Sequence, residues 1–593
     1  MKYSLKKGIL FLASIFLCIL LFIGFQTFRF HRLTNTLFRE EMSGDTLSMH
    51  YVLANPENYG IPGDCPSLPI YSREAQKQGY LQLKLYKKTA SQIHPVFFGK
   101  DNRLLHTLLM DYLESRSKEE NFPYYAEPLS PASGVQSSLP ILLAEYTFRS
   151  QQDVENYLSL LEQIPAYLEG IAQYEKEKAQ AGLFMSDIAA DKVIDQCYQI
   201  IDFNSLTNDT HFLNTSFSER LLPLVEKNLI TPEQRTAYIQ QNHILLLETV
   251  LPAYEALGDE ILVLKGSGGE ERGLSRLPKG KEYYTFLFSQ STGSDRSVAE
   301  VQNLLAMQLK KDTKELAALL EKSPDLSAAS LEESFPQAEP AFCLQDLRQR
   351  MAEDFPPMPG DTEPSCTVKR VSPSLEEYSS PAFYLTPPID DITENSIYIN
   401  EKDPMTGLDL YTTLAHEGYP GHLYQTVYFQ LCQQNKNSNP ARSLLHYGGY
   451  CEGWALYVEM QSYQYAKELL KESGASQDLL SLVEAMRLNR SIQLCLYSLL
   501  DLEIHYNGSS VEEVSDFLSG FGVTDFEIAQ NIYEYIAQEP ANYPKYYVSY
   551  LEFEILKEEA KEKWGESYSD IRFHQKILET GPCPFPTLRD MIL

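Results

Sequence analysis

Apolar side chains recur at every third or fourth position along most of the chain, which is the spacing of helices that bury one face. The pattern is clear between residues 34 and 322, and it returns at 459–470 and at 482–504. Examples are Leu139, Leu142, Leu143 and Tyr146, then Tyr157, Leu160, Leu161 and Ile164, then Ile244, Leu247, Val250 and Leu251. We interpret these stripes as contacts between helices and predict a mostly α fold.

Three short segments interrupt the helical pattern at 367–371, 382–386 and 396–400. The first and third are rich in β-branched residues, and prolines separate the segments, so we predict three strands of a small sheet. This sheet either has a structural role only or presents an edge strand that can pair with an extended peptide.

The first 28 residues combine a basic start with a long apolar run. Lys2, Lys6 and Lys7 precede a charge-free run of 18 residues from Gly8 to Phe25. As a helix this run spans about 27 Å, close to the hydrocarbon thickness of a bilayer. A cleaved signal peptide is the alternative, but no pair of small residues marks a cleavage site, so we predict an uncleaved anchor in residues 1–28. The lysines favour a cytoplasmic N-terminus and therefore a body outside the cytoplasm, which is secreted if the segment is cleaved.

The remaining chain is long enough for a large core, and its charge excludes one class of partner. It carries 50 Lys and Arg against 81 Asp and Glu, a formal charge of −31, which repels nucleic acid phosphates. A stretch rich in Pro, Ser and Glu at 323–388 suggests a connection between two parts. We predict an N-terminal helical half at 29–340 and a catalytic half at 341–593.

The nine cysteines contain no Cys-x-x-Cys pair, so a cysteine zinc knuckle or redox motif is not supported. Outside the cytoplasm a disulfide is permitted, and Cys343 with Cys366 is the pair to test first. Cys451 is an alternative metal ligand, although a small buried residue is the simpler interpretation.

A His-rich motif, His416-Glu417-Gly418-Tyr419-Pro420-Gly421-His422, holds the strongest chemical signal. In the familiar zinc motif on a helix the second histidine follows the first by four residues. Six residues on, it would point about 240° away on an unbroken helix. Pro420 and Gly421 break helices, so we predict a helix over 408–419, a bend, and a second helix from His422. The bend either brings both imidazoles to one metal or is a turn with two surface histidines.

Two glutamates about thirty residues later are candidates to complete the site. Glu452 and Glu459 are seven residues apart and therefore share one helical face. A glutamate on a following helix is a common third zinc ligand, and another carboxylate can orient a ligating histidine. The alternative is a pair of solvated surface glutamates, but the apolar residues Trp454 to Tyr457 between them argue against it.

The two motifs together, His-Glu-Gly-Tyr-Pro-Gly-His and the later Glu452-Gly-Trp-Ala-Leu-Tyr-x-Glu459, resemble the bacterial family called domain of unknown function 885. The segments 277–284, 397–400 and 501–505 also resemble it, and the similarity spans roughly residues 200–560. The family is regarded as similar to zinc metallopeptidases and distantly related to carboxypeptidase Taq and thimet-type peptidases. The resemblance implies a large multi-helix, zincin-like fold with a small β-sheet beside the active-site helix. The chain departs from the family pattern at Leu423, where many members have a second histidine, and at Glu552, near where a glycine is common.

These observations assign candidate roles. His416, His422 and Glu452 are expected to bind Zn²⁺, with Glu417 as the base for water and Glu459 orienting a histidine. Asp501 and His505 are four residues apart on a predicted helix, so the carboxylate can orient the imidazole, and the resemblance places His505 near the substrate. Tyr543, Tyr546, Tyr547 and Tyr550 form a phenol cluster, from which Tyr547 and Tyr550 are the candidates to stabilise an oxyanion.

The sequence therefore predicts a membrane-anchored, extracytoplasmic zinc peptidase that hydrolyses short peptides. One alternative is a metal-dependent hydrolase of another amide or an ester. The other is a catalytically inactive surface protein that keeps the architecture as a binding module.

Overall fold

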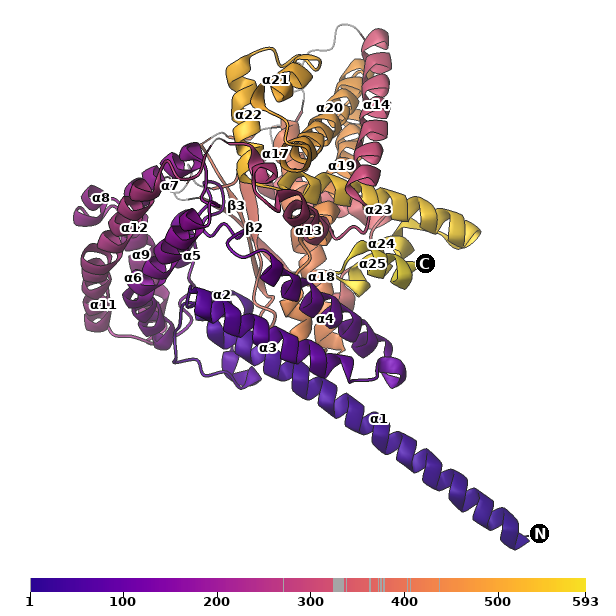
Figure 1. Ribbon diagram of the computed structural model, residues 1–593. Coiled ribbons are helices and arrows are strands. Elements are labelled where there is room, and N and C mark those ends of the chain that lie inside the picture. The colour runs from indigo at the N-terminus through magenta and orange to yellow at the C-terminus, as the bar shows by residue number, and fades with distance from the viewer. Residues whose placement is uncertain are drawn as a thin grey trace.

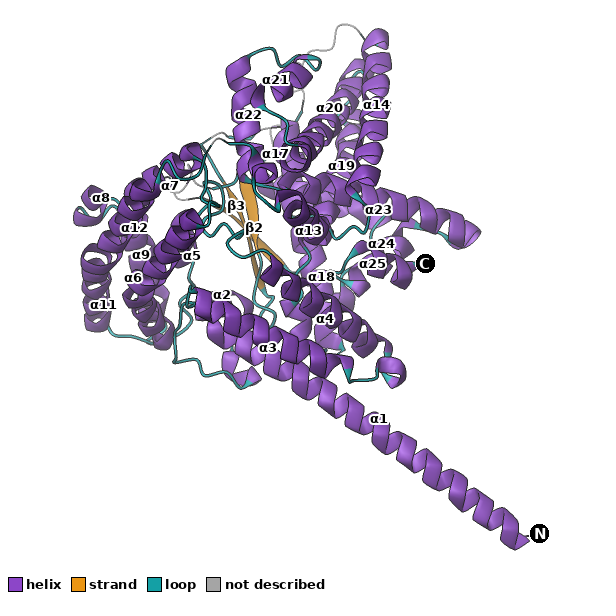
Figure 2. Ribbon diagram, in the orientation of Figure 1, coloured by secondary structure: helices purple, strands orange, loops and turns teal. Residues whose placement is uncertain are grey.

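The computed structural model describes residues 2–269, 271–323, 335–336, 339–361, 364–371, 373, 376, 379–402, 404–405, 407–436 and 438–593. Helices make up most of this part of the chain, and one small sheet lies among them (Figures 1 and 2). The predicted mostly α fold with a minor sheet is confirmed.

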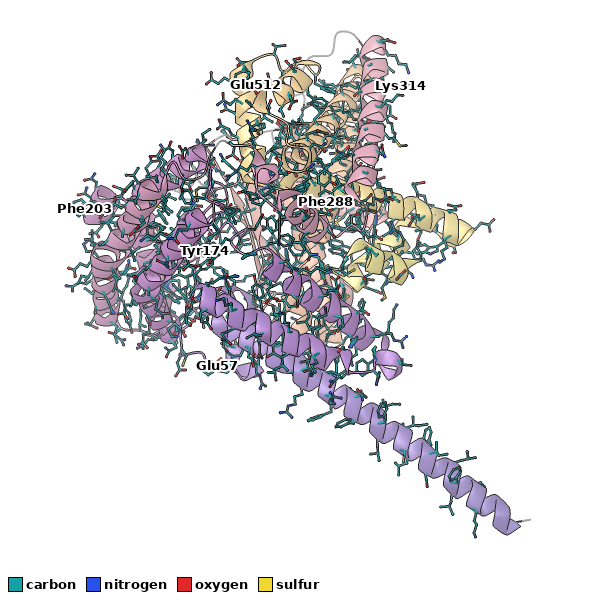
Figure 3. All side chains as sticks on the ribbon, viewed as in Figure 1. Glu57, Tyr174, Phe203, Phe288, Lys314 and Glu512 are labelled. Carbon is teal, nitrogen blue, oxygen red and sulfur yellow. The ribbon has the colours of Figure 1, made fainter. Side chains whose placement is uncertain are left out.

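The chain begins with one long helix, α1 (Lys2–Gly44), whose two parts have different surroundings. Between Ile9 and Phe25 the large apolar side chains are exposed, and Figure 3 shows this part of α1 standing clear of all other elements. Further along, Phe30 and Leu37 are buried in the body. The segment Lys7–Gly44 is long and apolar enough to cross a membrane, and an 18-residue window within it has a mean hydropathy of 2.8. The predicted N-terminal apolar helix is present.

Thirteen further described helices precede residue 323. They are α2 (Thr46–Val52), α3 (Arg73–Ser91), α4 (Lys100–Lys118), α5 (Val135–Ala144), α6 (Gln151–Gln180), α7 (Asp187–Ile200), α8 (Phe203–Thr207), α9 (Phe212–Arg220), α10 (Leu222–Glu226), α11 (Pro232–Leu245), α12 (Leu251–Leu264), α13 (Gly280–Thr292) and α14 (Val298–Lys322). Capping boxes begin the longest of them, since Ser150 pairs with Asp153 in α6 and Ser297 with Glu300 in α14. The helices α5 to α12 surround one hydrophobic core.

The described helices of the C-terminal half are α16 (Pro340–Arg350), α17 (Gly407–Glu417), α18 (His422–Asn435), α19 (Gly448–Glu472), α20 (Gln477–Leu502), α21 (Val511–Ser519), α22 (Phe526–Gln538), α23 (Asn542–Trp564), α24 (Asp570–Thr580) and α25 (Phe585–Ile592). Most of them surround a second core, whereas α21 and α22 enclose a smaller cluster of their own with the end of α20. Trp454 is fully buried in the second core. Phe30 of α1 and Leu108 of α4 belong to it as well, so N-terminal helices pack against the C-terminal half.

The sheet lies between the two cores (Figure 1). It consists of β1 (Ser365–Arg370), β2 (Ala382–Leu385) and β3 (Glu394–Ile399), in the order β1-β3-β2. β3 pairs in parallel with β1 and antiparallel with β2. Because side chains alternate along a strand, Ile397 points into the larger core and Tyr398 into the smaller one. All three predicted strands are present.

The cysteines correct one expectation. All nine are free thiols, and Cys343 in α16 is not bonded to Cys366 in β1. Burial raises the pKa of each of these two thiols to about 11, as expected for small buried side chains rather than reactive ones.

Candidate metal centre

The site is built on the break between α17 and α18. Backbone hydrogen bonds join the bend to the helix on each side. Gly418 N donates to Leu414 O at 2.9 Å, and Tyr424 N donates to Gly418 O at 3.2 Å. The peptide bond between Tyr419 and Pro420 is cis. Trp454 Nε1 donates to Pro420 O at 3.0 Å and so attaches the bend to α19. The predicted bend is present.

Glycine is required at the last position of this bend. A Cβ atom on Gly421 would lie 1.8 Å from His416 O and 2.4 Å from Ala415 O. Since no heavy-atom side chain fits there, only glycine allows the chain to turn back against the end of α17 and present His422 beside His416.

The bend brings together His416, His422 and Glu452. One ligand atom from each lies within 4.8 Å of the other two. Glu452 Oε2 is 3.3 Å from His422 Nε2 and 3.7 Å from His416 Nε2. Zinc bonds of about 2.0–2.2 Å place two donors on one tetrahedral ion about 3.4 Å apart. Both nitrogen–oxygen distances are close to this value, so the two nitrogens and one oxygen fit a zinc ion in number and type, and the oxygen fits in its spacing from each nitrogen.

The other nitrogen of His416 is held by a buried carboxylate. Glu459 Oε2 lies 2.9 Å from His416 Nδ1, and Arg490 Nε donates to Glu459 Oε1 at 3.0 Å. Burial opposes ionisation of Glu459, but the charge of Arg490 and the bond to His416 lower its pKa to about 2. An ionised Glu459 fixes the ring so that Nε2 faces Glu452, which is the usual support for a ligating histidine.

The pKa values of His416 and Glu452 are also shifted, and these shifts apply to the site without a bound metal ion. Burial alone would lower the pKa of His416, but its bonds to Glu452 and Glu459 raise it to about 10. Burial would raise the pKa of Glu452, but its bonds to the two histidines hold it well below its usual value. The pocket therefore stabilises positive charge at the place where the three side chains meet.

Glu417 lies at the end of α17, next to the first histidine, and contacts the sheet. Its Oε2 accepts a hydrogen bond of 2.9 Å from Tyr384 N in β2. β2 is an edge strand of the described sheet, so this N–H belongs to its unpaired side. The bond orients the carboxylate and shows that the open edge of β2 faces the site.

The phenol beside the site is Tyr546, rather than Tyr547 or Tyr550. Its ring stacks on His416, with centroids 6.3 Å apart. Burial, with the charges of Glu452 and Glu417, raises the pKa of Tyr546, so its hydroxyl stays protonated. Tyr547 instead contacts Ser491 at 2.7 Å, on another side of α23. Tyr550 is buried there too, with Glu554 and Arg487 as charged neighbours.

Close packing of two helices sets the position of Tyr546. A Cβ on Gly449 would lie 2.7 Å from Ser549 Oγ, and one on Gly453 would lie 2.5 Å from Ser549 Cβ. These two glycines are one helical turn apart in α19, which lets α23 approach closely. Tyr546 lies three residues before Ser549, on the face that meets α19. The sequence names this tyrosine as part of a cluster but gives no sign of which helix it faces.

His505 and Asp501 do not form the expected pair. The two ring nitrogens of His505 both bind backbone, since Leu274 N donates to Nδ1 at 3.0 Å and Nε2 donates to Ile536 O at 2.9 Å. Asp501 accepts bonds from Tyr284 Oη at 2.6 Å and Ala541 N at 3.0 Å. Burial lowers the pKa of His505 to about 4 and raises that of Asp501 to about 8. Both side chains are fully buried and hold elements together, so the pairing that was predicted from their spacing of four residues is not formed.

Three comparisons place the chain among known proteins. A sequence model of a family described as "Bacterial protein of unknown function (DUF885)" matches residues 57–592. A solved structure of a candidate lipoprotein from Colwellia psychrerythraea is similar, with a TM-score of 0.81, 19% identity, and coverage of 95% of this chain and 98% of that chain. A candidate lipoprotein of unknown function from Shewanella oneidensis has a TM-score of 0.63, 15% identity, and coverage of 95% and 99%. At these identities the similarity concerns the fold alone. The comparison with curated proteins finds no match.

Proposed function

The chain belongs to the bacterial family of unknown function DUF885, and from the chemistry of its metal centre we propose that it is a membrane-anchored zinc peptidase that hydrolyses short peptides. One observation carries the proposal. His416, His422 and Glu452 converge within 4.8 Å, and the carboxylate of Glu417 lies on the residue that follows the first histidine. This donor set leaves a fourth position, as in catalytic rather than structural zinc sites.

When bound, the zinc ion supplies Lewis acidity, which makes a water a better nucleophile and polarises the scissile carbonyl. Glu417 accepts the proton of the attacking water and delivers it to the leaving amine. The N–H of Tyr384 holds Glu417 in place for both transfers. Glu459 keeps Nε2 of His416 directed at the centre, and Arg490 keeps Glu459 ionised.

Two features suit a peptide substrate. The open edge of β2 presents backbone groups next to Glu417, and an extended peptide can pair with such an edge without a particular sequence. The protonated hydroxyl of Tyr546 can donate to the oxyanion that forms during amide hydrolysis. The helical architecture, with a small sheet beside α17, suits the zincin-like fold that the family resemblance implies.

The apolar part of α1 supports the proposed location. Its side chains are exposed over the length of a bilayer, and the two solved structures described above are of candidate lipoproteins. The lysines that precede the run favour a cytoplasmic N-terminus, with the catalytic body on the other side of the membrane.

Replacement of Glu417 by Gln tests the proposal. The variant keeps the shape of the side chain and removes the base, so we expect one zinc per chain and a loss of peptide hydrolysis of about 10²–10⁴-fold. Metal analysis and amine release from a mixture of short peptides measure the two quantities. Glu468→Gln, on an exposed part of the same α19 helix that carries Glu452, is the matched control and should behave as the wild type.

Other outcomes would identify the alternatives. Wild-type protein that binds zinc but cleaves only non-peptide amides or esters would be a different hydrolase. Protein that holds much less than one zinc per chain would be a binding module without catalysis. Full peptide hydrolysis by Glu417→Gln would exclude Glu417 as the base.

A further inference from the structure

A turn between α3 and α4 lies beside α1, at the end of its apolar run. α3 runs antiparallel to α1, because Tyr86 Oη donates to Glu40 and, six residues after Tyr86, Gln92 Oε1 accepts from Arg29 Nη2 at 3.4 Å. The 3₁₀ turn Pro95–Phe97 then leads to α4. Figure 1 shows α3 and α4 beside α1 at the place where the apolar part of α1 leaves the body.

Two contacts place this turn level with the apolar run itself. His94 N donates to Gln26 Oε1 at 3.3 Å, and the His94 ring stacks on Phe22, with centroids 6.5 Å apart. Phe22 lies three residues, or about 4.5 Å of helix, before Phe25, the last residue of the run. When α1 spans a membrane, the turn therefore reaches the boundary between hydrocarbon and headgroups.

Val96, in the middle of the turn, is an apolar side chain that points into the surroundings of the protein. It is 72% exposed, although it lies next to a segment built to enter lipid. Transfer of an exposed apolar side chain out of water is favourable. Amphipathic segments at membrane surfaces bury such side chains at the boundary between headgroups and acyl chains.

Basic residues surround this turn, in contrast to the acidic chain as a whole. The segment 26–39 has three basic residues and 87–110 has four, against one aspartate in the two together, whereas the sequence has a net charge of −31. The aspartate, Asp101, pairs with Lys436 at 3.6 Å. Four of the basic residues are exposed and have no carboxylate partner in the described part of the chain: Arg32, Lys88, Lys100 and Arg103.

The start of α4 lies as low on α1 as the turn does. α4 runs parallel to α1, since the His106 ring lies 5.7 Å from the Phe30 ring and Arg116, ten residues later, is a charged neighbour of Glu41. Lys100 precedes His106 by six residues, or about 9 Å of helix. It is therefore level with the last residues of the apolar run.

We propose that Arg32, Lys88, Val96, Lys100 and Arg103 form a second membrane contact, which binds anionic phospholipid headgroups. Val96 enters the boundary below the headgroups, and the four cations contact lipid phosphates. A single helix leaves the body free to tilt and turn on the membrane, and the second contact fixes its orientation. This inference rests on the membrane-spanning role proposed for α1 and not on the peptidase activity.

The position of the cations favours a membrane over a soluble partner. Arg32 follows Phe25 by seven residues, or about 10 Å of helix, and Lys100 lies lower. The headgroup layer above the hydrocarbon is about 5–8 Å thick, and the long side chains of Lys and Arg extend toward it. The charges therefore lie within about 8 Å, one Debye length, of the lipid phosphates.

Tryptophan fluorescence of the full-length protein in nanodiscs tests the proposal, because the sequence has only two tryptophans. Val96→Trp adds an indole to the turn, and Val263→Trp is the control, at a valine that is 78% exposed on α12, far from the apolar part of α1 in Figure 1. The discs contain phosphatidylglycerol and a phosphatidylcholine brominated near the top of its acyl chain. We expect the added fluorescence of Val96→Trp to fall at least about twofold and that of Val263→Trp to stay unchanged. Equal quenching of the two would overturn the proposal.

A pair of charge reversals tests the role of the cations. Lys88→Glu/Lys100→Glu, made in the Val96→Trp background, should reduce the quenching at least about twofold. Lys310→Glu/Lys314→Glu changes the charge equally on α14, far from α1 in Figure 3, and should leave the quenching unchanged. Potassium chloride at about 1 M should act as the first pair does, because it screens the attraction. Quenching that neither the first pair nor salt reduces would overturn anionic lipid as the partner.

Flotation with vesicles in alkaline carbonate separates this contact from the anchor. All variants should float with the lipid, because α1 is unchanged in them. Wild-type protein that does not float would contradict the membrane span and this contact together, whereas floating protein without quenching of Val96→Trp would overturn the contact alone. Glu417→Gln in the Val96→Trp background should be quenched as Val96→Trp is, so that loss of peptidase activity and loss of the contact are independent results.

Discussion

Tyr546 illustrates how one residue acquires a role from its position on a helix. Its hydroxyl and ring face Glu452 and His416, whereas Tyr547, one residue later, points about 100° away into the contact with α20. The two phenols therefore offer a matched pair for mutation, since each loses only an oxygen when replaced by phenylalanine.

Tyr546→Phe is expected to reduce peptide hydrolysis by about 10²-fold, because a donor to the oxyanion is removed. Zinc content should remain one per chain. Tyr547→Phe should keep its activity and lose about 1 kcal/mol of stability, since its bond to Ser491 is buried. Steady-state kinetics and urea denaturation measure the two effects, and equal activity losses in both variants would contradict the assignment.

Asp501 makes stability depend on pH. Burial raises its folded-state pKa to about 8, well above the unfolded value near 3.8. The folded protein therefore holds a proton that the unfolded chain loses. The stabilisation from this proton is fully present below about pH 4 and is lost as the pH rises to about 8, by at most about 1.4 kcal/mol per pH unit.

Asp501→Asn keeps the oxygen that accepts from Tyr284 and Ala541 and removes the ionisation. The stability of the variant relative to the wild type should therefore increase between pH 5 and pH 8. Urea denaturation at several pH values measures this difference. A difference that does not change with pH would show that Asp501 is ionised in the folded protein.

The residues of the centre differ in how far the sequence reveals them. His416, His422 and Glu452 are recognisable because their donor chemistry and the Pro-Gly pair lie in two short motifs. Tyr546 is not recognisable in this way, because the four tyrosines on α23 point in several directions. The sequence does not show which helices surround each of them. His505 has a plausible spacing to Asp501, but only the tertiary structure shows that backbone groups occupy both of its nitrogens.

At the scale of elements, the contact between α19 and α23 connects packing with the site. Gly449 and Gly453 allow α23 to lie close to α19, and this contact fixes Tyr546 against His416. The strands were predictable within two residues because β-branched residues and prolines mark them. The sequence does not predict the parallel pairing of β1 with β3, because this pairing depends on the path that the chain takes from one strand to the other.

Gly453→Ala tests the tight contact of the two helices. The new Cβ would lie 2.5 Å from Ser549 Cβ, so we expect a loss of about 1–3 kcal/mol in the free energy of unfolding. Gly79→Ala in α3 is the control, since nothing lies within 4 Å of its Cβ. It should be stabilised by about 0.5–1 kcal/mol. Thermal and urea denaturation compare the two, and similar stabilities would contradict the account of this interface.

At the scale of the whole molecule, periodicity predicts which helix faces are apolar but not which helices they meet. The sequence suggests two halves that meet near residue 340. In the structure, however, α1 and α4 of the first half pack into the core of the second half. The sheet between the two cores brings β2 to the end of α17, so elements far apart in the chain build one site. The exposed apolar part of α1 extends from this body and suggests a membrane-associated protein.

The zinc centre is the claim on which the proposed activity depends. Anomalous diffraction at the zinc absorption edge, from crystals of the protein with one equivalent of zinc, tests it most directly. We predict a single peak within about 2.0–2.2 Å of a nitrogen of His416, a nitrogen of His422 and an oxygen of Glu452. A peak elsewhere, or no peak between these three side chains, would contradict the account.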